Sequence, residues 1–416
     1  THVLRIVMEK SLEWGEELWI AALDVEKAFD RLHHASIFPV LLASGVTPSI
    51  VAALRGLYTD MKASVVLWPG AESRCFAVER WVRQGDPLSP LLFNLVLNDV
   101  FEEVMPTWIR RGYGTNVGET VKGERLTHVA FADDMTIIAR SWTSLKRMLS
   151  QLRAALAKRG LKLHPTKCKV QTNRPDCSER GNVAVDPDFS INILPEGEAI
   201  KVLGTLLDVH DPTKTEILNR ISTGWRMFWG MSRLLLNRRI SVKRRMRLFN
   251  STVCSCVLWC TQSWTPRAEE LRALQSAENK MLRRILGTGR APNEEWVDWI
   301  RRVTRKAKSL AQSCGVRVWT QAHLESKWLW AGHVARRPTS TWVWRVTKWR
   351  DSEWQHMAEE MGSRLLRPSR RRWMKWEDGI RRHCADIGWS NWQEKAQLRD
   401  EWKNHAKGFS NHETEG

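Results

Sequence analysis

Two adjacent aspartates, Asp133 and Asp134, stand between two largely apolar stretches of the sequence. Residues 126–129 before them and 135–139 after them predict a buried strand, a turn and a second strand, with both acids at the tip. Carboxylates in such a place are costly to desolvate, and a divalent metal ion is a usual compensating partner. Aspartate is also a common turn residue, so the pair alone is equally consistent with an ordinary hairpin.

A third acid, Asp24, stands at the end of residues 18–25, whose length and apolar composition predict a buried strand. Further strands are expected at residues 63–83, around the Trp68-Pro69-Gly70 turn, at 162–171, and in a hairpin at 199–209. Residues 172–198 are rich in Pro, Asp, Gly and Asn and are predicted to be a polar loop.

Helical spacing of apolar residues completes the first half of the chain. The predicted helices are residues 1–17, 35–44, 48–58, 91–104 and 144–159. Asp86 or Ser89 is expected to cap the fourth of these, and Gly160 to end the fifth. From Pro212 onward the pattern changes to long basic helices. The chain begins without Met inside a helical pattern, which we interpret as a start within a domain.

The net charge of +19 is carried by one half of the chain. Residues 211–416 hold 40 Lys and Arg against 21 Asp and Glu, whereas residues 1–210 hold 25 of each. A neutral half that bears acids, followed by a strongly basic half, indicates a catalytic part joined to a part that binds a polyanion.

The eight cysteines lack the paired spacing of zinc sites. Cys254, Cys256 and Cys260 lie in an apolar stretch and are interpreted as buried free thiols. The sequence shows no secretion signal and no uncharged run of the roughly 18 residues that a membrane helix needs. We therefore expect a nuclear or cytoplasmic protein that is not secreted and has no membrane partner.

Five strings occur in the order found in the palm of reverse transcriptases, and the chain most resembles the enzymes of non-LTR (LINE-type) retrotransposons. These strings are Leu-Asp-Val-Glu-Lys-Ala-Phe-Asp at 23–30, the loop at 83–90, Phe-Ala-Asp-Asp at 131–134, the segment at 160–170 and Lys-Val-Leu-Gly at 201–204.

The resemblance implies an α+β fold in three parts. A polymerase palm with an antiparallel sheet, helices and an RRM-like core is expected over residues 1–210, with truncated fingers. An all-helical thumb is expected at 211–320, and a small, helical, basic Trp- and Arg-rich region at 321–416. The chain begins about twenty residues before Asp24, so most of the fingers region of the family is expected to be missing.

The implied chemistry is nucleotidyl transfer by two Mg²⁺ or Mn²⁺ ions to a primer 3′ end on an RNA template. Asp24, Asp133, Asp134 and the Val25 carbonyl would bind the metal, and Lys167 would act on the pyrophosphate leaving group. Lys162 and Lys169 lie near Lys167 in sequence and are alternatives to it.

Other residues take substrate roles through the same resemblance. Phe29 would lie beneath the sugar of the incoming deoxynucleoside triphosphate and exclude a 2′-hydroxyl, while Gln84 and Gly85 would pack against the nucleotide and the template base. Leu203 and Gly204 would hold the primer, which is a DNA oligonucleotide or a nicked target DNA. The arginines expected to bind phosphates are Arg244, Arg245, Arg301 and Arg302.

Two alternatives to an active polymerase stay open. One is a group II intron maturase, which is disfavoured because the tail lacks a Cys-rich nuclease pattern. The other is an inactive retrotransposon remnant that only binds RNA or DNA. In the tail, interleaved Trp and Arg around 330–337 and 367–373 suit stacking on bases, or else the tryptophans form a small core. His333 is interpreted as a packing or phosphate-contacting residue.

Overall fold

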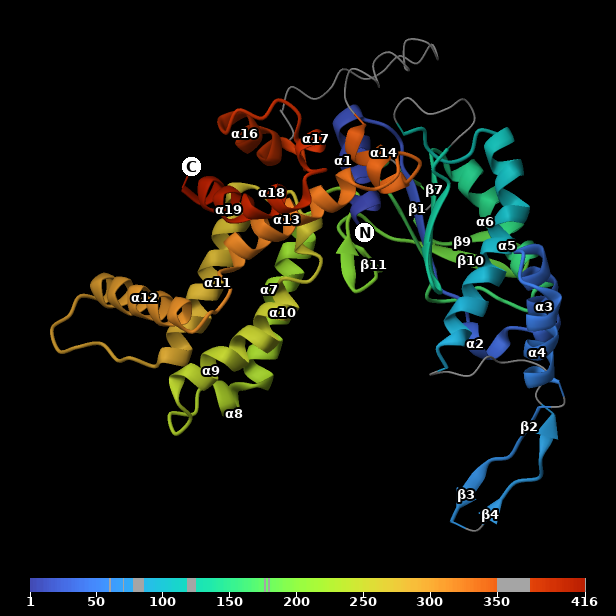
Figure 1. Ribbon diagram of the computed structural model, residues 1–416, viewed down its shortest axis with the longest axis horizontal. Coiled ribbons are helices and arrows are strands. Elements are labelled where there is room, and N and C mark those ends of the chain that lie inside the picture. The colour runs from blue at the N-terminus through green and yellow to red at the C-terminus, as the bar shows by residue number, and fades with distance from the viewer. Residues whose placement is uncertain are drawn as a thin grey trace. The chain divides into compact units, whose positions relative to one another are not determined.

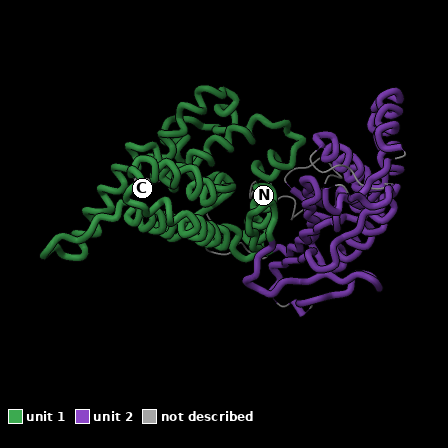
Figure 2. Tube along the Cα trace, turned by 90° about the horizontal axis from the view of Figure 1, so that it is seen from below, with its two compact units in different colours: residues 1–15, 201–416 green, residues 16–200 purple. Residues whose placement is uncertain are grey.

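The structure is a computed structural model that describes residues 1–59, 61–69, 71–77, 86–117, 125–175, 177–178, 180–349 and 375–415 (Figure 1). The chain forms two compact units, coloured separately in Figure 2. We call residues 16–200 the sheet unit, and residues 1–15 with 201–416 the helical unit. The division at 210 and 320 that was expected from the sequence stays a prediction.

The sheet unit is built on six strands in the order β6, β7, β1, β8, β10, β9. The central strand β1 (Trp19–Leu23) is antiparallel to both neighbours, β7 (Asp134–Ala139) and β8 (Lys169–Thr172). The remaining strands are β6 (His128–Phe131), β9 (Gly181–Asp186) and β10 (Phe189–Ile193). Neighbours in the sheet are antiparallel except β8 and β10, which are parallel. The expected mixed α+β class with a sheet is confirmed.

One face of this sheet packs on α5 (Leu88–Arg110) and α6 (Trp142–Lys158). Alternate residues of β1 and β7, among them Ala21, Leu23 and Ile137, are buried in the core that these helices share. The N-cap of α5 is Pro87 and not Asp86 or Ser89 as expected, and the Asp86 side chain, one residue earlier, accepts a hydrogen bond from the Leu88 backbone N–H at 3.0 Å. Helix α5 extends beyond the predicted 91–104 at both ends.

The remaining elements of the sheet unit are shorter. They are α2 (Ala28–Arg31), α3 (His34–Ala43), α4 (Pro48–Tyr58), β2 (Lys62–Ala63), β3 (Val66–Trp68), β4 (Ala71–Glu72) and β5 (Phe76–Ala77). Strands β2 and β5 pair, as do β3 and β4, which confirms the strands expected on either side of Trp68. Gly70 and residues 78–83 lie outside the described residues.

The prediction of a polar loop over residues 172–198 was wrong. Residues 181–193 form the β9–β10 hairpin, and Val185, Phe189 and Ile191 are buried beneath it. These apolar residues alternate with polar ones, as a strand with one buried face requires, but Pro and Asp at the turn dominate the local composition.

The helical unit begins with α1 (His2–Trp14), which ends at Gly15 in the left-handed conformation (φ 65°). It continues with the hairpin β11 (Ile200–Val202) and β12 (Thr205–Leu207), as predicted for 199–209. The helices that follow are α7 (Lys214–Gly230), α8 (Ser232–Leu235), α9 (Val242–Phe249), α10 (Ser255–Val257), α11 (Ala268–Leu286) and α12 (Trp296–Ser313). A short π-helix at Asn250–Cys254 and a 3₁₀-helix at Thr261–Ser263 flank α10.

The C-terminal helices enclose tryptophans. Helix α13 (Trp319–Ala335) packs on α19 (Ala406–Glu415), with α14 (Trp342–Lys348), α16 (Asp378–Asp386), α17 (Trp392–Lys395) and α18 (Arg399–Asn404) around it. Trp328, Trp376, Trp392 and Trp402 are at most 3% exposed. Base stacking by these four is thus ruled out by burial, and the alternative of a tryptophan core is confirmed for them; residues 367–373 lie outside the described residues.

The string around Gly332 in α13 is a packing motif. A Cβ at Gly332 would lie 2.5 Å from two atoms of the Trp402 indole. That indole cannot retreat, because it stacks on Trp328 at 3.9 Å and the two rings donate to each other's backbone carbonyls at 2.7 and 2.9 Å. His333 is exposed and accepts a hydrogen bond from Arg337 at 3.1 Å.

Replacing Gly332 by Ala is therefore expected to destabilise the helical unit by about 1–3 kcal/mol through overpacking. Gly230→Ala is the matched control, because a Cβ at Gly230 meets no atom within 4 Å and its helical position favours Ala. The midpoint of urea unfolding, followed by tryptophan fluorescence, measures both. Equal midpoints for the two variants would contradict the packing role.

Among the described residues, no helix combines the length and the apolar character needed to cross a membrane. All eight cysteines are free. Cys254 is buried as predicted, and burial raises its pKa to about 12, while Cys256 and Cys260 are only half-buried.

Candidate active site

Strand register places the acids of the two predicted motifs on neighbouring strands. The last pair of the β1–β7 ladder is Leu23 with Met135. One further step of the same register sets Asp24 opposite Asp134, and the next sets Val25 opposite Asp133. Leu23 and Met135 belong to the core beneath α5 and α6. Because successive side chains of a strand point to opposite faces of the sheet, Asp24 and Asp134, the next residues, belong to the other face. Both carboxylates are half-buried.

The segment after β1 is held in place by its other neighbour. The Asp24 carbonyl accepts from the His164 N–H at 2.8 Å, and the Glu26 N–H donates to the Lys162 carbonyl at 2.8 Å. Val25 pairs with Leu163 between these two bonds. In such an antiparallel pair the intervening residue directs its own N–H and C=O away from the partner strand. The Val25 carbonyl thus points toward the side of β7.

The turn that carries Asp133 is strained. Phe131 and Asp134 pair across it, leaving Ala132 and Asp133 as a two-residue turn. Ala132 adopts φ 51°, a conformation that residues with a Cβ rarely take. Strain of this kind persists only where the surroundings impose it, and it is concentrated at functional sites.

Lys167 is the basic residue of the 160–170 segment that contacts the acids. Its Nζ lies 3.2 Å from Asp24 Oδ2, with the Lys167 side chain 62% exposed and that of Asp24 31% exposed. An exposed pair of this type contributes little to stability. Beneath it, the buried Cys168 receives a hydrogen bond from the Asp24 N–H at 3.5 Å, and burial raises the pKa of this thiol to about 11.

The oxygen ligands available at the ends of β1 and β7 suit a hard divalent cation. Carboxylate and carbonyl oxygens are the ligands of Mg²⁺, which takes one or two carboxylates from the protein and completes its sphere with water and phosphate oxygens. The cationic Lys167 already shows that this site accommodates positive charge beside Asp24. Within the described part of the chain, no three His, Cys, Asp or Glu side chains are gathered closely enough to enclose a metal by themselves.

Phe29 lies on α2, in the same connection that leaves β1 at Asp24. Its ring is half-buried and packs against Phe93 of α5 with centroids 5.3 Å apart. The preceding Lys27 takes φ 47°, which turns the chain sharply into α2. Gln84 and Gly85, the other predicted nucleotide contacts, lie outside the described residues.

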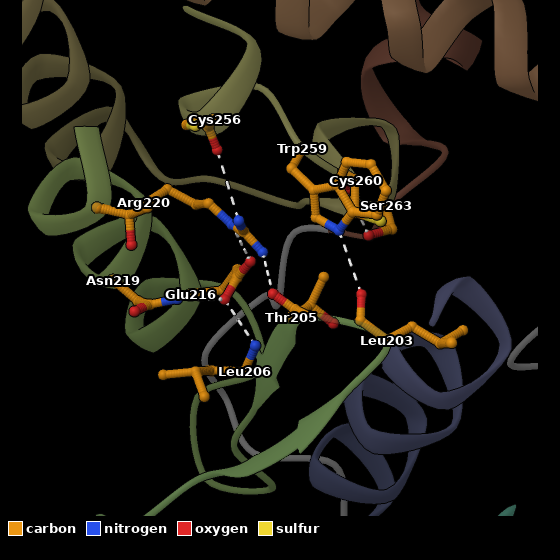
Figure 3. A network of polar contacts seen from close by, with 12 residues as sticks. Leu203, Thr205, Leu206, Glu216, Asn219, Arg220, Cys256, Trp259, Cys260 and Ser263 are labelled. Carbon is orange, nitrogen blue, oxygen red and sulfur yellow. Dashed lines mark hydrogen bonds and ion pairs between the residues drawn. The ribbon is translucent and has the colours of Figure 1, made fainter. Parts of the chain in front are cut away.

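The predicted primer-holding residues Leu203 and Gly204 form the turn of the β11–β12 hairpin in the helical unit. Both adopt positive φ, 50° and 75°, which is the backbone of a tight hairpin turn. The Leu203 carbonyl accepts a hydrogen bond from the Trp259 indole at 3.2 Å (Figure 3).

A buried ion pair on α7 supports this turn, and the sequence prediction missed it. Glu216 is fully buried, pairs with the guanidinium of Arg220 at 2.5 Å and accepts from the Leu206 N–H at 2.7 Å (Figure 3). Arg220 also donates to the Gly204 carbonyl. The sequence did hold a signal for this pair. Glu216 and Arg220 are spaced four residues apart, on the same face of α7 as the buried Gly224 and Phe228.

The predicted phosphate-binding arginines differ in accessibility. Arg244 and Arg301 are exposed on α9 and α12. Arg302 is partly exposed but pairs with Glu294 at 2.7 Å. The structure contradicts the prediction for Arg245, because its guanidinium is buried and donates to the backbone carbonyls of Leu235, Ile240 and Ile285. Its donors serve the interior of the helical unit, and it is left out of the proposed nucleic-acid surface.

Comparison with known proteins identifies the family. Residues 5–207 match the reverse transcriptase (RNA-dependent DNA polymerase) family. The chain is 31% identical over 223 residues to the Pol polyprotein of the type-1 retrotransposable element R2 of Nasonia vitripennis, covering 52% of this chain and 21% of that protein. It is 36% identical over 166 residues to the Pol polyprotein of element R2DM of Drosophila melanogaster, covering 40% of this chain and 15% of that protein.

The chain thus spans about a fifth or less of the length of these two relatives. Among solved structures, telomerase of Candida albicans in complex with a fragment of telomeric RNA is 15% identical, with a TM-score of 0.34, over 74% of this chain and 49% of that one. Acids from two motifs meet at the ends of neighbouring strands, and the family match spans both, so residues 5–207 belong to the reverse transcriptase family and are similar to the enzymes of non-LTR retrotransposons.

Proposed function

We propose that the chain is an RNA-directed DNA polymerase that adds deoxynucleotides to a primer 3′ end on an RNA template. The observation that carries this proposal is the register of the neighbouring strands β1 and β7, which brings Asp24, just after β1, beside the start of β7, where Asp133 and Asp134 lie. The family match supports the same reaction.

Asp24, Asp133, Asp134 and the Val25 carbonyl would hold Mg²⁺, which when bound stabilises the charge on the attacking oxygen and on the leaving pyrophosphate. Lys167 is proposed to contact the triphosphate. As an exposed ammonium beside Asp24, it can release that carboxylate and donate a hydrogen bond to a phosphate oxygen. The exposed Arg244 and Arg301, together with Arg302, are proposed to contact backbone phosphates of the nucleic acid.

The direct test is extension of oligo(dT) on poly(rA) with dTTP and Mg²⁺. Extension that requires both the RNA template and the metal is the expected result. Binding of the primer–template in a gel shift, with no extension at any protein concentration or with Mn²⁺, would exclude the polymerase and leave a nucleic-acid-binding remnant.

Phe29 is proposed to discriminate between sugars. Replacing Phe29 by Ala removes the ring that would meet a 2′-hydroxyl, so the preference for dTTP over UTP, measured as a ratio of kcat/KM values, is expected to fall about a hundredfold, which is ~2.7 kcal/mol. Phe29→Tyr keeps the ring and is expected to keep the preference. An unchanged ratio in the Ala variant would refute this role.

A further inference from the structure

Trp259 is an aromatic residue that is both exposed and rigidly held. Its side chain is 53% exposed, although a large apolar ring is usually covered. Its indole N–H is bonded to the Leu203 carbonyl at 3.2 Å, so the ring is fixed at the turn of the β11–β12 hairpin (Figure 3). A Cβ at Gly204 would lie 3.6 Å from the indole nitrogen, which places the ring in van der Waals range of the turn.

The backbone that carries Trp259 is tied to the same turn. Arg220 donates one hydrogen bond to the Gly204 carbonyl and another to the Cys256 carbonyl at 3.5 Å, so one guanidinium joins the hairpin to the segment before Trp259. Helix α10 also packs tightly on α7, since a Cβ at Gly224 would lie 2.5 Å from Val257. Leu203, Gly204 and Trp259 therefore form one preorganised surface, which we call the Trp259 ledge.

The chemistry of the Trp259 ledge suits a nucleotide at the end of a strand. A tryptophan ring can stack on any base, because every base has a π-face, and can also pack on a deoxyribose. A ring that is already immobilised loses little conformational entropy when it makes such a contact. Trp259 itself lies in the basic part of the chain, where residues 211–416 hold 40 Lys and Arg against 21 Asp and Glu, so a polyanion is the favoured occupant of the ledge.

We propose that Trp259 contacts the terminal nucleotides of the primer strand and thereby positions the primer end on the hairpin turn. This inference rests on the proposed function, and on the expectation from the sequence that Leu203 and Gly204 hold the primer. It adds a side chain from a distant part of the sequence to that role, with Arg220 as the residue that keeps hairpin and ring together.

The experiment that tests contact uses a primer whose 3′-terminal nucleotide is 5-iodo-2′-deoxyuridine, annealed to an RNA template and bound to the full chain. Irradiation followed by peptide mass spectrometry is expected to locate the crosslink at Trp259. Crosslinks confined to other residues would overturn the proposal. A crosslink at Trp259 in protein that does not extend the primer would refute the polymerase activity and leave the contact in place.

Binding of the primer–template, measured by fluorescence anisotropy, gives a second reading. Trp259→Ala is expected to raise the Kd about tenfold, and Trp259→Phe, which keeps a ring but loses the hydrogen bond to Leu203, is expected to raise it less. Trp229→Ala is the matched control, since Trp229 is 50% exposed and lies nine residues beyond Arg220 on α7, about 14 Å along the helix. Equal affinities for the Ala variants at 259 and 229 would overturn the proposal.

Discussion

Replacing Asp24 by Asn is expected to reduce the rate of primer extension about 10²- to 10³-fold, which corresponds to a loss of about 2.7–4 kcal/mol of transition-state stabilisation. The amide keeps the size of the side chain but removes the charge that would bind the metal. Asp133→Asn is expected to have an effect of the same order, because its carboxylate stands on the neighbouring hairpin. Single-turnover extension of a labelled primer measures the loss, and an anisotropy titration checks that primer–template binding is retained.

The fold should tolerate these substitutions. The only ion pair of Asp24 recorded within the described residues is the exposed one with Lys167, and its loss costs little. Asp188→Asn is the matched control in the sheet unit, since Asp188 is an exposed acid at the β9–β10 turn that pairs with Arg153 at 2.9 Å. We expect the Asp188 variant to extend the primer at the wild-type rate and the Asp24 variant to lose extension. Wild-type extension by Asp24→Asn would remove Asp24 from the reaction.

Replacing Arg220 by Met is expected to destabilise the β11–β12 hairpin by about 3–5 kcal/mol, because it leaves the Glu216 carboxylate buried without its partner. The Gly204 carbonyl also loses its donor. Since the chain has two units, the effect is best measured locally, as hydrogen exchange of the backbone amides in residues 200–207, with residues 134–139 of the sheet unit as the internal reference.

Two further variants make this test specific. Arg226→Met is the same substitution on the same helix, but Arg226 is exposed and donates only to Thr223 among the described contacts, so exchange at 200–207 should stay unchanged. Glu216→Gln combined with Arg220→Met removes the stranded charge while keeping an acceptor for the Leu206 N–H, and is expected to recover part of the lost protection. Equal exchange in the Arg220 and Arg226 variants would show that the ion pair does not hold the hairpin.

Most secondary structure near the acids could be predicted from the sequence, because the patterns are local. The apolar run that ends at Asp24 became β1, and the helix predicted at 48–58 was found with the same bounds. The β9–β10 hairpin was missed because turn-rich composition around residue 187 outweighed a short apolar alternation. Helix α5 was predicted too short because it continues through Pro106, a residue that usually ends a helix, as far as Arg110, with Trp108 buried in the core.

The sequence by itself determined which residues could perform the chemistry. Asp24, Asp133, Asp134 and Lys167 are identified by residue type and order, which are properties of the chain alone. Their roles in metal binding and catalysis stay predictions. Only the tertiary structure decided which of them meet. It paired Lys167 with Asp24, because the strand that follows residue 167 is the antiparallel neighbour of β1.

Tertiary structure also decided which charged and aromatic residues face solvent. Arg244 and Arg245 are neighbours in sequence, yet Arg244 is exposed, whereas Arg245 is buried and donates to three backbone carbonyls. Trp402 is buried in the C-terminal core, whereas Trp259 is exposed and anchored to a turn 56 residues earlier. Composition could not separate these cases, because burial depends on contacts between segments far apart in sequence, and local patterns do not encode such contacts.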